Sequence, residues 1–154
     1  MPWPRRFSVL VLFLTCTAGS LRAQVGVVGV RDLAFGNVIP GIQTAVSPSD
    51  PVQSGMWEVT AQRGDRVRVR LTLPSQLTAP GGFQMPVTFG NNDAIAVSDA
   101  PGARPVTFNP KASKNFRLVT SGRFFIFLGG RVTPAGTQAP GAYTATALLT
   151  VTVF

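Results

Sequence analysis

The chain contains no histidine and only six acidic residues among its 154 positions, and cysteine and tyrosine occur once each. Without histidine, a hydrolytic triad that uses histidine as its base and a metal site with histidine ligands are both excluded. The acids are scattered along the chain, so the facing carboxylate pair that glycoside hydrolysis needs is not indicated. Ser113 and Lys114 are a poor catalytic pair, because adjacent residues of a strand point to opposite faces. The composition predicts a protein that is not an enzyme and has no cofactor or metal site.

Residues 1–23 have the composition of a secretory signal peptide. Two arginines precede an apolar run over residues 7–18, and residues 21–23 (Leu-Arg-Ala) provide a small-residue cleavage site. The run is shorter than the ~20 residues that a transmembrane helix needs. We expect cleavage after Ala23, export to the periplasm or the cell surface, and no transmembrane segment in the mature chain. Lipidation at Cys16 is the less favoured alternative, because the residues before it lack the usual lipoprotein pattern.

The mature domain, residues 24–154, would contain no cysteine and 11 basic against 6 acidic residues, a net charge of +5. A chain of this length buries enough surface to fold without disulfides. Valine and threonine are frequent, 16 glycines and 13 prolines interrupt the chain, and no long stretch has apolar positions at helical spacing. These features predict a single, turn-rich, all-β domain.

Residues 56–73 give the clearest strand prediction. Residues 56–61 and 66–73 both have strand patterns, and the Gly64-Asp65 pair between them is typical of a β-hairpin turn. Further short strands recur about every ten residues, as in β-sandwiches. They are expected at residues 25–30, 85–89, 94–97, 105–108, 115–119 and 123–128. Residues 124–127 are apolar on both faces, so we expect that strand to be central or covered.

Arg66, Arg68 and Arg70 alternate with apolar residues and therefore project from one face of their strand. Charged side chains commonly guard an exposed sheet, and this is the favoured interpretation. The alternative is a site for anions such as phosphate, an acidic polysaccharide or lipid headgroups. No nucleic acid is expected as a partner, because no basic residue interleaves the aromatic run at 124–127.

Residues 141–154 have a strand pattern without interruption. Odd-numbered residues from Tyr143 to Val153 share one face, which we expect to be the core face, and mostly threonines occupy the other. Such a strand lies either inside a closed sheet or at an edge with which another chain can pair. Residues 24–30 are rich in glycine, which weakens packing, and are a candidate for a movable arm.

Four segments in this order resemble the DUF4402 domain family, and the resemblance covers essentially the whole mature chain. The segments are Asp32–Gly36, Val67–Pro74, Gly129–Pro134 and Gly141–Phe154. That family is similar in pattern to spore coat protein U and to the fimbrial subunits of chaperone-usher systems. The resemblance implies an all-β, immunoglobulin-like (pilin-like) antiparallel β-sandwich without enzymatic activity.

The fimbrial resemblance further implies assembly by strand addition, in which a periplasmic chaperone lends a strand that the arm of a like subunit then replaces. Residues 24–30 would be the donor arm and residues 141–154 the strand that pairs with the chaperone. The candidate strand-exchange residues are Val25, Val27, Val28, Val30, Gly141, Tyr143, Leu149, Val151, Val153 and Phe154. The expected function is that of a structural or surface subunit. The alternative is a self-contained module that binds an anionic glycan or lipid headgroup through Arg66, Arg68 and Arg70.

Overall fold

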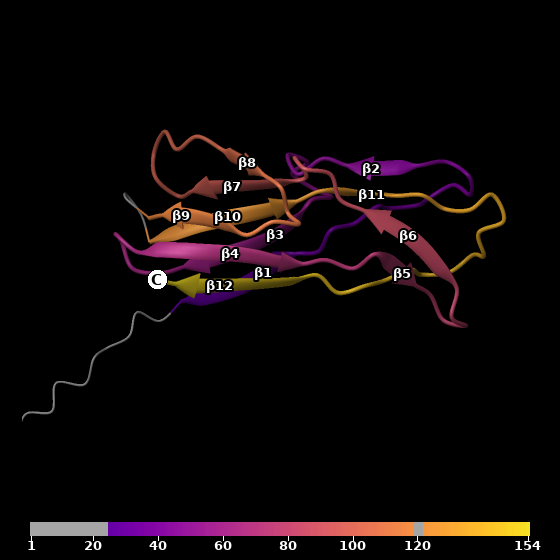
Figure 1. The fold of residues 1–154 in the computed structure, drawn as a ribbon. Coiled ribbons are helices and arrows are strands. Elements are labelled where there is room, and N and C mark those ends of the chain that lie inside the picture. Colours follow the sequence, from indigo (N-terminus) through magenta and orange to yellow (C-terminus); the bar gives the residue numbers. More distant parts are fainter. Residues whose placement is uncertain (1–24, 119–121) are drawn as a thin grey trace, which may run out of the picture.

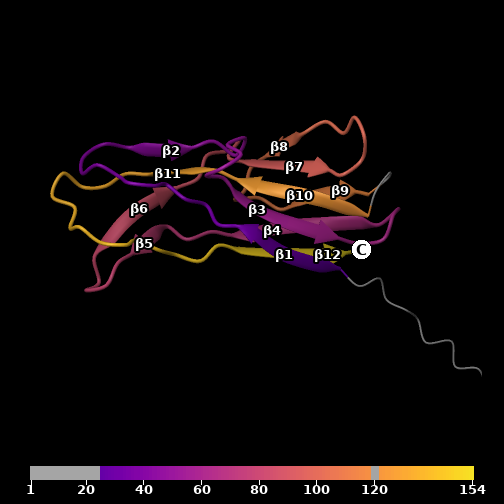
Figure 2. The same cartoon turned by 180° about the vertical axis from the view of Figure 1, so that it is seen from behind.

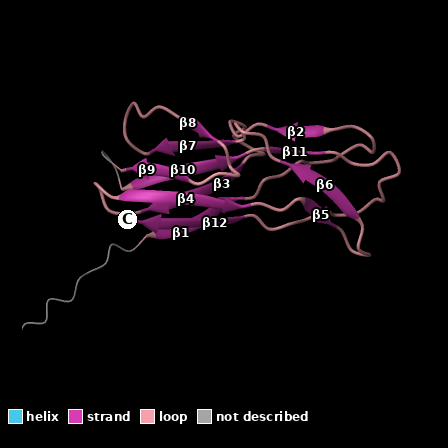
Figure 3. Ribbon diagram, viewed as in Figure 1, coloured by secondary structure: helices cyan, strands magenta, loops and turns pink. Residues whose placement is uncertain are grey.

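A computed structural model describes residues 25–118 and 122–154 of the chain (Figure 1). The signal peptide expected over residues 1–23, with Cys16, lies outside the described residues. The described part is built from twelve strands and contains no helix (Figure 3), so the all-β prediction is confirmed. It accordingly includes no helix of the length and apolarity needed to span a membrane.

The strands follow one another closely along the chain. They are β1 (Gly26–Arg31), β2 (Thr44–Val46), β3 (Gly55–Thr60), β4 (Arg66–Thr72), β5 (Gln76–Thr78), β6 (Gln84–Thr88), β7 (Ala94–Ser98), β8 (Val106–Phe108), β9 (Lys114–Arg117), β10 (Arg123–Leu128), β11 (Gly130–Val132) and β12 (Leu148–Val153). The three-residue strands β2, β5 and β11 have no counterpart among the strands predicted from sequence.

All strand pairs are antiparallel, and they form three sheets in a sandwich-like arrangement. The five-stranded sheet has the order β1-β3-β10-β7-β8, and the three-stranded sheet has the order β12-β4-β9. The four-stranded sheet β2-β11-β6-β5 lies at the opposite end of the elongated domain from the chain terminus (Figures 1 and 2). One consequence is that β1 and β12 are both edge strands, each belonging to a different sheet.

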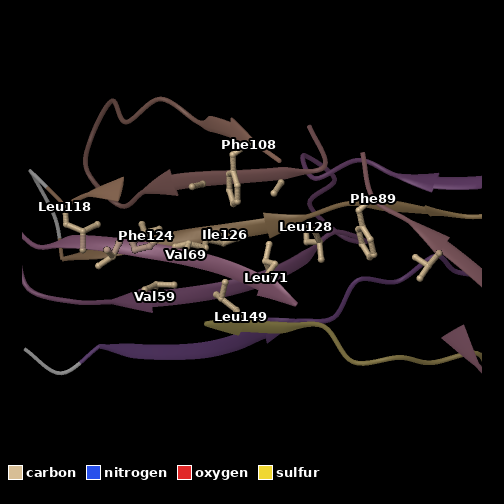
Figure 4. Packing of buried hydrophobic residues seen from close by; sticks show 14 of the residues in the cluster. Val59, Val69, Leu71, Phe89, Phe108, Leu118, Phe124, Ile126, Leu128 and Leu149 are labelled. Atoms are coloured by element: carbon tan, nitrogen blue, oxygen red, sulfur yellow. The ribbon is translucent and has the colours of Figure 1, made fainter. Parts of the chain in front are cut away.

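The hydrophobic core contains the inward faces of strands from all three sheets (Figure 4). In β4 every second side chain is buried and the arginines between them are exposed, as predicted. The core cluster consists of Val59, Val67, Val69, Leu71, Met85, Val87, Phe89, Ala94, Ala96, Phe108, Leu118, Phe124, Ile126, Leu128, Val132 and Leu149. Fully burying one large aliphatic side chain of this kind contributes about 1.5–3 kcal/mol, so this shared interior holds the sheets together.

Strand β10 is central in the five-stranded sheet, as predicted, and pairs with β3 and β7. Its inward side chains Phe124, Ile126 and Leu128 are buried, while Phe125 and Phe127 on the outer face are half-buried. At its end the chain passes directly into β11 of the next sheet. A Cβ atom at Gly129 would lie 2.4 Å from the carbonyl oxygen of Val46, so only glycine fits at this crossing.

The predicted hairpin over residues 56–73 is wrong. β3 pairs with β1 and β10, whereas β4 pairs with β12 and β9, so the two strands belong to different sheets. The turn between them is real: the N–H of Asp65 donates to the carbonyl oxygen of Gln62 over 3.1 Å, and Gly64 has a φ of 97°. The turn carries the chain from one layer to the other. Its local sequence pattern is the same as that of a hairpin turn, so the pattern does not distinguish a hairpin from a crossing between sheets.

The final strand is shorter than predicted, because β12 begins at Leu148. Continuing the register of β12 and β4 would place Thr146 opposite Pro74, which has no N–H to donate, so the ladder ends there. Upstream, Thr144 instead forms an isolated bridge with Thr78, through N–H···O distances of 2.9 and 3.0 Å. Within β12 the predicted alternation holds in part. Leu149 is buried, Val151 is half-buried and the even-numbered residues are exposed, but Val153, which was expected on the core face, is exposed near the end of the strand.

Candidate functional site

Strand β12 pairs with β4 on one side only, and its other edge pairs with no strand of the part of the chain that the structure describes. The N–H of Phe154 donates to the carbonyl oxygen of Arg66 over 3.0 Å. In an antiparallel ladder, hydrogen-bonded pairs alternate with non-bonded pairs, so the even-numbered residues of β12 bond to β4. The N–H and C=O groups of Leu149, Val151 and Val153 therefore point away from β4, along the open edge.

Strand β1 is the edge of the facing five-stranded sheet. The N–H of Ala61 donates to Gly122, which places the odd-numbered residues of β3 in the ladder with β10 and the even-numbered ones in the ladder with β1. Val28, opposite Glu58, therefore bonds to β3, while the backbone groups of Val27 and Gly29 point outward. The register shifts between Gly29 and Arg31. Of the predicted donor residues, Val27, Val28 and Val30 thus belong to a strand paired within their own chain, and Val25, just before that strand, packs against the core.

The edges of β1 and β12 lie at the same border of the sandwich (Figures 1 and 2). A groove of about 1200 Å³ continues from this border between residues 29–40 and residues 134–147. Its apolar lining includes Leu33, Phe35, Val38, Trp57, Tyr143 and Ala147, which are half-buried and pack against the core. Of these six, only Tyr143 was among the predicted site residues, although Leu33 and Phe35 alternate like inward residues of a strand.

Tyr143 is fixed in the wall of this groove. Its hydroxyl donates to the carbonyl oxygen of Ala139 over 2.7 Å and accepts from Nε2 of Gln138 over 2.6 Å. Gly141 has a φ of 157°, and a Cβ atom there would lie 3.3 Å from Cβ of Ala79. Both predicted residues therefore shape the approach to β12, but neither lies within it.

Arg31 anchors the end of β1 to the loop that precedes β3. Its Nε donates to the carbonyl oxygen of Ser54 over 2.7 Å, its Nη2 donates to the Ser54 hydroxyl over 2.9 Å, and its Nη1 donates to the carbonyl oxygen of Pro51. Ser54 is fully buried. Asp50 orders the same loop by accepting the N–H groups of Gln53 and Val52, each over 2.8 Å. These two bonds, followed by the charge of Arg31, lower the pKa of Asp50.

The basic residues predicted in β4 lie together on the outer face of the three-stranded sheet. Arg66, Arg68 and Arg70 are all exposed. The register adds a fourth arginine, Arg117 of β9, directly opposite Arg66. Cross-strand register, which placed Arg117 here, is not visible in the sequence of a single strand. We call these four arginines the basic face.

The acidic residues are distributed elsewhere. Asp99 and Glu58 lie 2.7 and 3.6 Å from Arg123, and the first contact raises the pKa of Arg123. Asp93 lies 3.9 Å from Arg131. Within residues 25–118 and 122–154, no three acidic, histidine or cysteine side chains gather in a way that could hold a metal ion.

We compared the chain with known protein families and with curated proteins. No protein-family model matches the chain, and no curated protein matches it.

Proposed function

We propose that the protein is an exported, non-enzymatic structural or surface subunit that assembles by strand addition at the open edge of β12. The observation that carries this proposal is the row of backbone groups on Leu149, Val151 and Val153, which point away from β4 at the sheet edge. Unpaired edges of this kind are templates for an incoming strand. Leu149 is buried in the core and Val151 packs against it, so an added strand would extend a sheet that already has a packed inner face.

We further propose that the domain is an immunoglobulin-like, pilin-like sandwich. A first strand at the edge of one sheet, a last strand at the edge of the other, and a β3–β4 connection that crosses between layers support an immunoglobulin-like, pilin-like sandwich. The proposed DUF4402 family and export through residues 1–23 rest on the sequence segments described above.

The proposed occupant of the β12 edge is the segment 24–30 of a second copy, or a strand lent by a periplasmic chaperone before assembly. Cleavage after Ala23 would leave only Gln24 and Val25 before β1, so this segment must leave β3 in order to be donated. Its exposure supports such a release. Val27, Val28 and Val30 are 39%, 60% and 51% exposed, so β1 buries little apolar surface in its own chain.

Sedimentation velocity of the mature chain over a range of concentrations tests this assembly. The wild type is expected to form oligomers, and Val151→Pro is expected to remain monomeric because proline removes an N–H of the open edge while sparing the bonds to β4. A wild type that stays monomeric, or a Val151→Pro variant that assembles normally, would contradict the proposal.

The donor segment is tested by a reversible disulfide between β1 and β3. Val28 and Glu58 are directly opposite in the register, at a spacing that suits a disulfide, and the mature chain has no other cysteine. With both residues changed to cysteine, the oxidised protein is expected to stay monomeric and to assemble after reduction. If oxidation has no effect while Val151→Pro abolishes assembly, β12 is the acceptor and the donor lies outside segment 24–30.

A further inference from the structure

The basic face occupies the outward side of the β12-β4-β9 sheet and has no acidic counterpart. Arg66, Arg68, Arg70 and Arg117 are exposed, and no carboxylate of the described residues lies within ion-pair distance of any of them. The residues that the structure does not describe, 1–24 and 119–121, contain no acidic residue that could neutralise the face.

The positions of the chain's other charged residues show that unpaired positive charge is concentrated at the basic face. Arg123 and Arg131 form ion pairs with acidic residues, and the charge of Arg31 acts on Asp50. The acid nearest to the basic face along the chain is Asp65, and its Oδ2 accepts the N–H of Gln62 in the turn before β4. Much of the mature chain's net positive charge is therefore presented on one side of one sheet.

Arg66 and Arg117 are directly opposite across β4 and β9. Their Cβ atoms are then about 4.5–5.5 Å apart, and like charges in such pairs destabilise a sheet. A bound anion between these side chains would relieve that repulsion. Charged residues on an edge strand can prevent unwanted strand pairing. Arg66 does not have this role, because it lies on the central strand of its sheet.

Arg68 is held in a defined orientation at the middle of the basic face. Its Nε donates to Oδ1 of Asn115 over 3.2 Å, and its guanidinium carbon lies 5.1 Å from the ring centre of Phe154. One of the five N–H donors of the guanidinium is used in this bond, which leaves the Nη groups for an anion that offers two oxygen acceptors, such as a carboxylate or a sulfate. Such bidentate pairs are shorter and stronger than neutral hydrogen bonds.

The row of arginines matches a linear ligand. Every second residue of a strand repeats at about 6.8 Å, so Arg66, Arg68 and Arg70 span about 14 Å along β4. Thr152 and Thr150 stand opposite Arg68 and Arg70, and both are exposed. Their hydroxyl groups can donate and accept hydrogen bonds. A ligand that carries both anionic and hydroxyl groups along one line would contact both rows.

We propose that the basic face binds an acidic polysaccharide, a chain that bears carboxylate or sulfate groups, lying along β4. A membrane is less well matched, because the exposed apolar side chains of this face, Leu148 and Phe154, stand apart with threonines between them and do not form one apolar area. Binding at this face does not depend on strand addition, since a strand added to β12 would extend the sheet sideways and leave the outward face open.

Binding of the mature protein to three soluble polymers tests the proposal by isothermal titration calorimetry at low and physiological salt. The polymers are heparin for sulfate, polygalacturonate for carboxylate and dextran as the neutral control. Binding to at least one of the two anionic polymers, weakening at higher salt, is expected, with none to dextran. No binding to either anionic polymer at low salt would overturn the proposal, and the stronger polymer identifies the anionic group.

Two double variants separate the basic face from net charge alone. Arg68→Thr with Arg70→Thr changes the face, while Arg104→Thr with Lys111→Thr removes the same charge from exposed loop positions. The first is expected to weaken binding at least tenfold and the second less than threefold. Equal losses in both would overturn the proposal, because binding would then follow overall charge. Thermal unfolding monitors the fold of each variant, and the face variant is expected to melt no lower than the control.

Vesicles with anionic lipid headgroups form the last arm of this experiment. The proposal expects the Arg68/Arg70 variant to lose polymer binding whether or not the wild type also binds vesicles weakly. Tight binding to vesicles with none to either anionic polymer would show that the face is a membrane contact and would overturn the assignment to a polysaccharide.

Discussion

Strands β1 and β12 border the same side of the sandwich, and they are held in place in different ways. β12 contains no glycine, and it inserts Leu149, which is only 7% exposed, into the core. β1 contains two glycines and a shift in register, and its valines remain 39–60% exposed. β1 is held by its ladder with β3 and by the bonds of Arg31 to the loop before β3.

This difference suggests which strand would accept a partner and which would move. An acceptor edge has to keep its backbone groups in register while the partner is absent, and side-chain packing does this for β12. A donor has to leave its own sheet at low cost, and β1 loses little buried apolar surface when it does. Side-chain packing, the Arg31 anchor and backbone bonding should therefore respond differently to mutation at the two edges.

The largest expected difference lies in side-chain packing. Leu149→Ala should lower the free energy of unfolding by about 2–5 kcal/mol, because it leaves a cavity beneath β12. Val27→Ala, the corresponding inward truncation on β1, should cost less than about 1 kcal/mol, since Val27 is 39% exposed and its loss leaves no enclosed cavity. Urea unfolding measures the loss of unfolding free energy in both variants. Equal losses would show that β1 is packed as firmly as β12 and is not suited to leave.

The next expected effect concerns the anchor of β1. Arg31→Met removes the bonds to Ser54 and Pro51 and leaves buried acceptors of Ser54 without this partner, so it should cost about 1.5–3 kcal/mol. Arg104→Met, which changes an exposed loop arginine, should stay within about 0.5 kcal/mol of wild type. Amide exchange should accelerate at Val28 and stay unchanged at Thr150 in the first variant. Equal acceleration at both positions would mean that the anchor serves the whole fold.

A smaller difference is expected from the alternation of hydrogen bonds along β12. Thr152→Pro removes a bond to β4, while Val151→Pro removes an N–H that points away from β4. The first variant should therefore be less stable than the second by about 1 kcal/mol. Thermal or urea unfolding decides the order, and the reverse order would refute the assignment of the open-edge residues.

The smallest effect is a response to pH at β1. The pKa of Asp50 is lowered below its ordinary value of 3.8 by the N–H groups of Gln53 and Val52. A lowered carboxyl pKa stabilises the fold fully above the unfolded value and loses this contribution as the pH falls through the folded value. Below pH 3.8 the loop amides of Gln53 and Val52 should shift in NMR spectra and β1 should loosen before β12. Asp50→Asn should abolish this response. A wild type whose loop amides show no pH response, like those of the variant, would contradict the prediction.

Much of the fold could be predicted from alternation alone. Val67, Val69 and the arginines between them fix the two faces of β4, and the apolar run from Phe124 to Phe127 identifies a central strand. The partner of each strand could not be predicted. The Gly64-Asp65 turn has the same local chemistry whether it closes a hairpin or crosses between sheets, and only packing across the core selects the second.

The residues of the candidate site were likewise only partly predictable from sequence. Single-strand patterns identified the arginines of β4 and the inward residues Leu149 and Val151. They could not identify Arg117, because its position opposite Arg66 depends on long-range register, or the end of the ladder at Pro74, which depends on what lies opposite Thr146. Strands of three residues, such as β11, are too short to give a periodic signal.

The most direct test of assembly at β12 is amide hydrogen exchange, read residue by residue, in the monomer and in the assembled state. In the dilute monomer, Thr150 and Thr152 should be protected by their bonds to β4, while Leu149, Val151 and Val153 exchange quickly. In the assembled state these three amides should become protected as well. Their protection already in the monomer, or their continued fast exchange after assembly, would contradict strand addition at this edge.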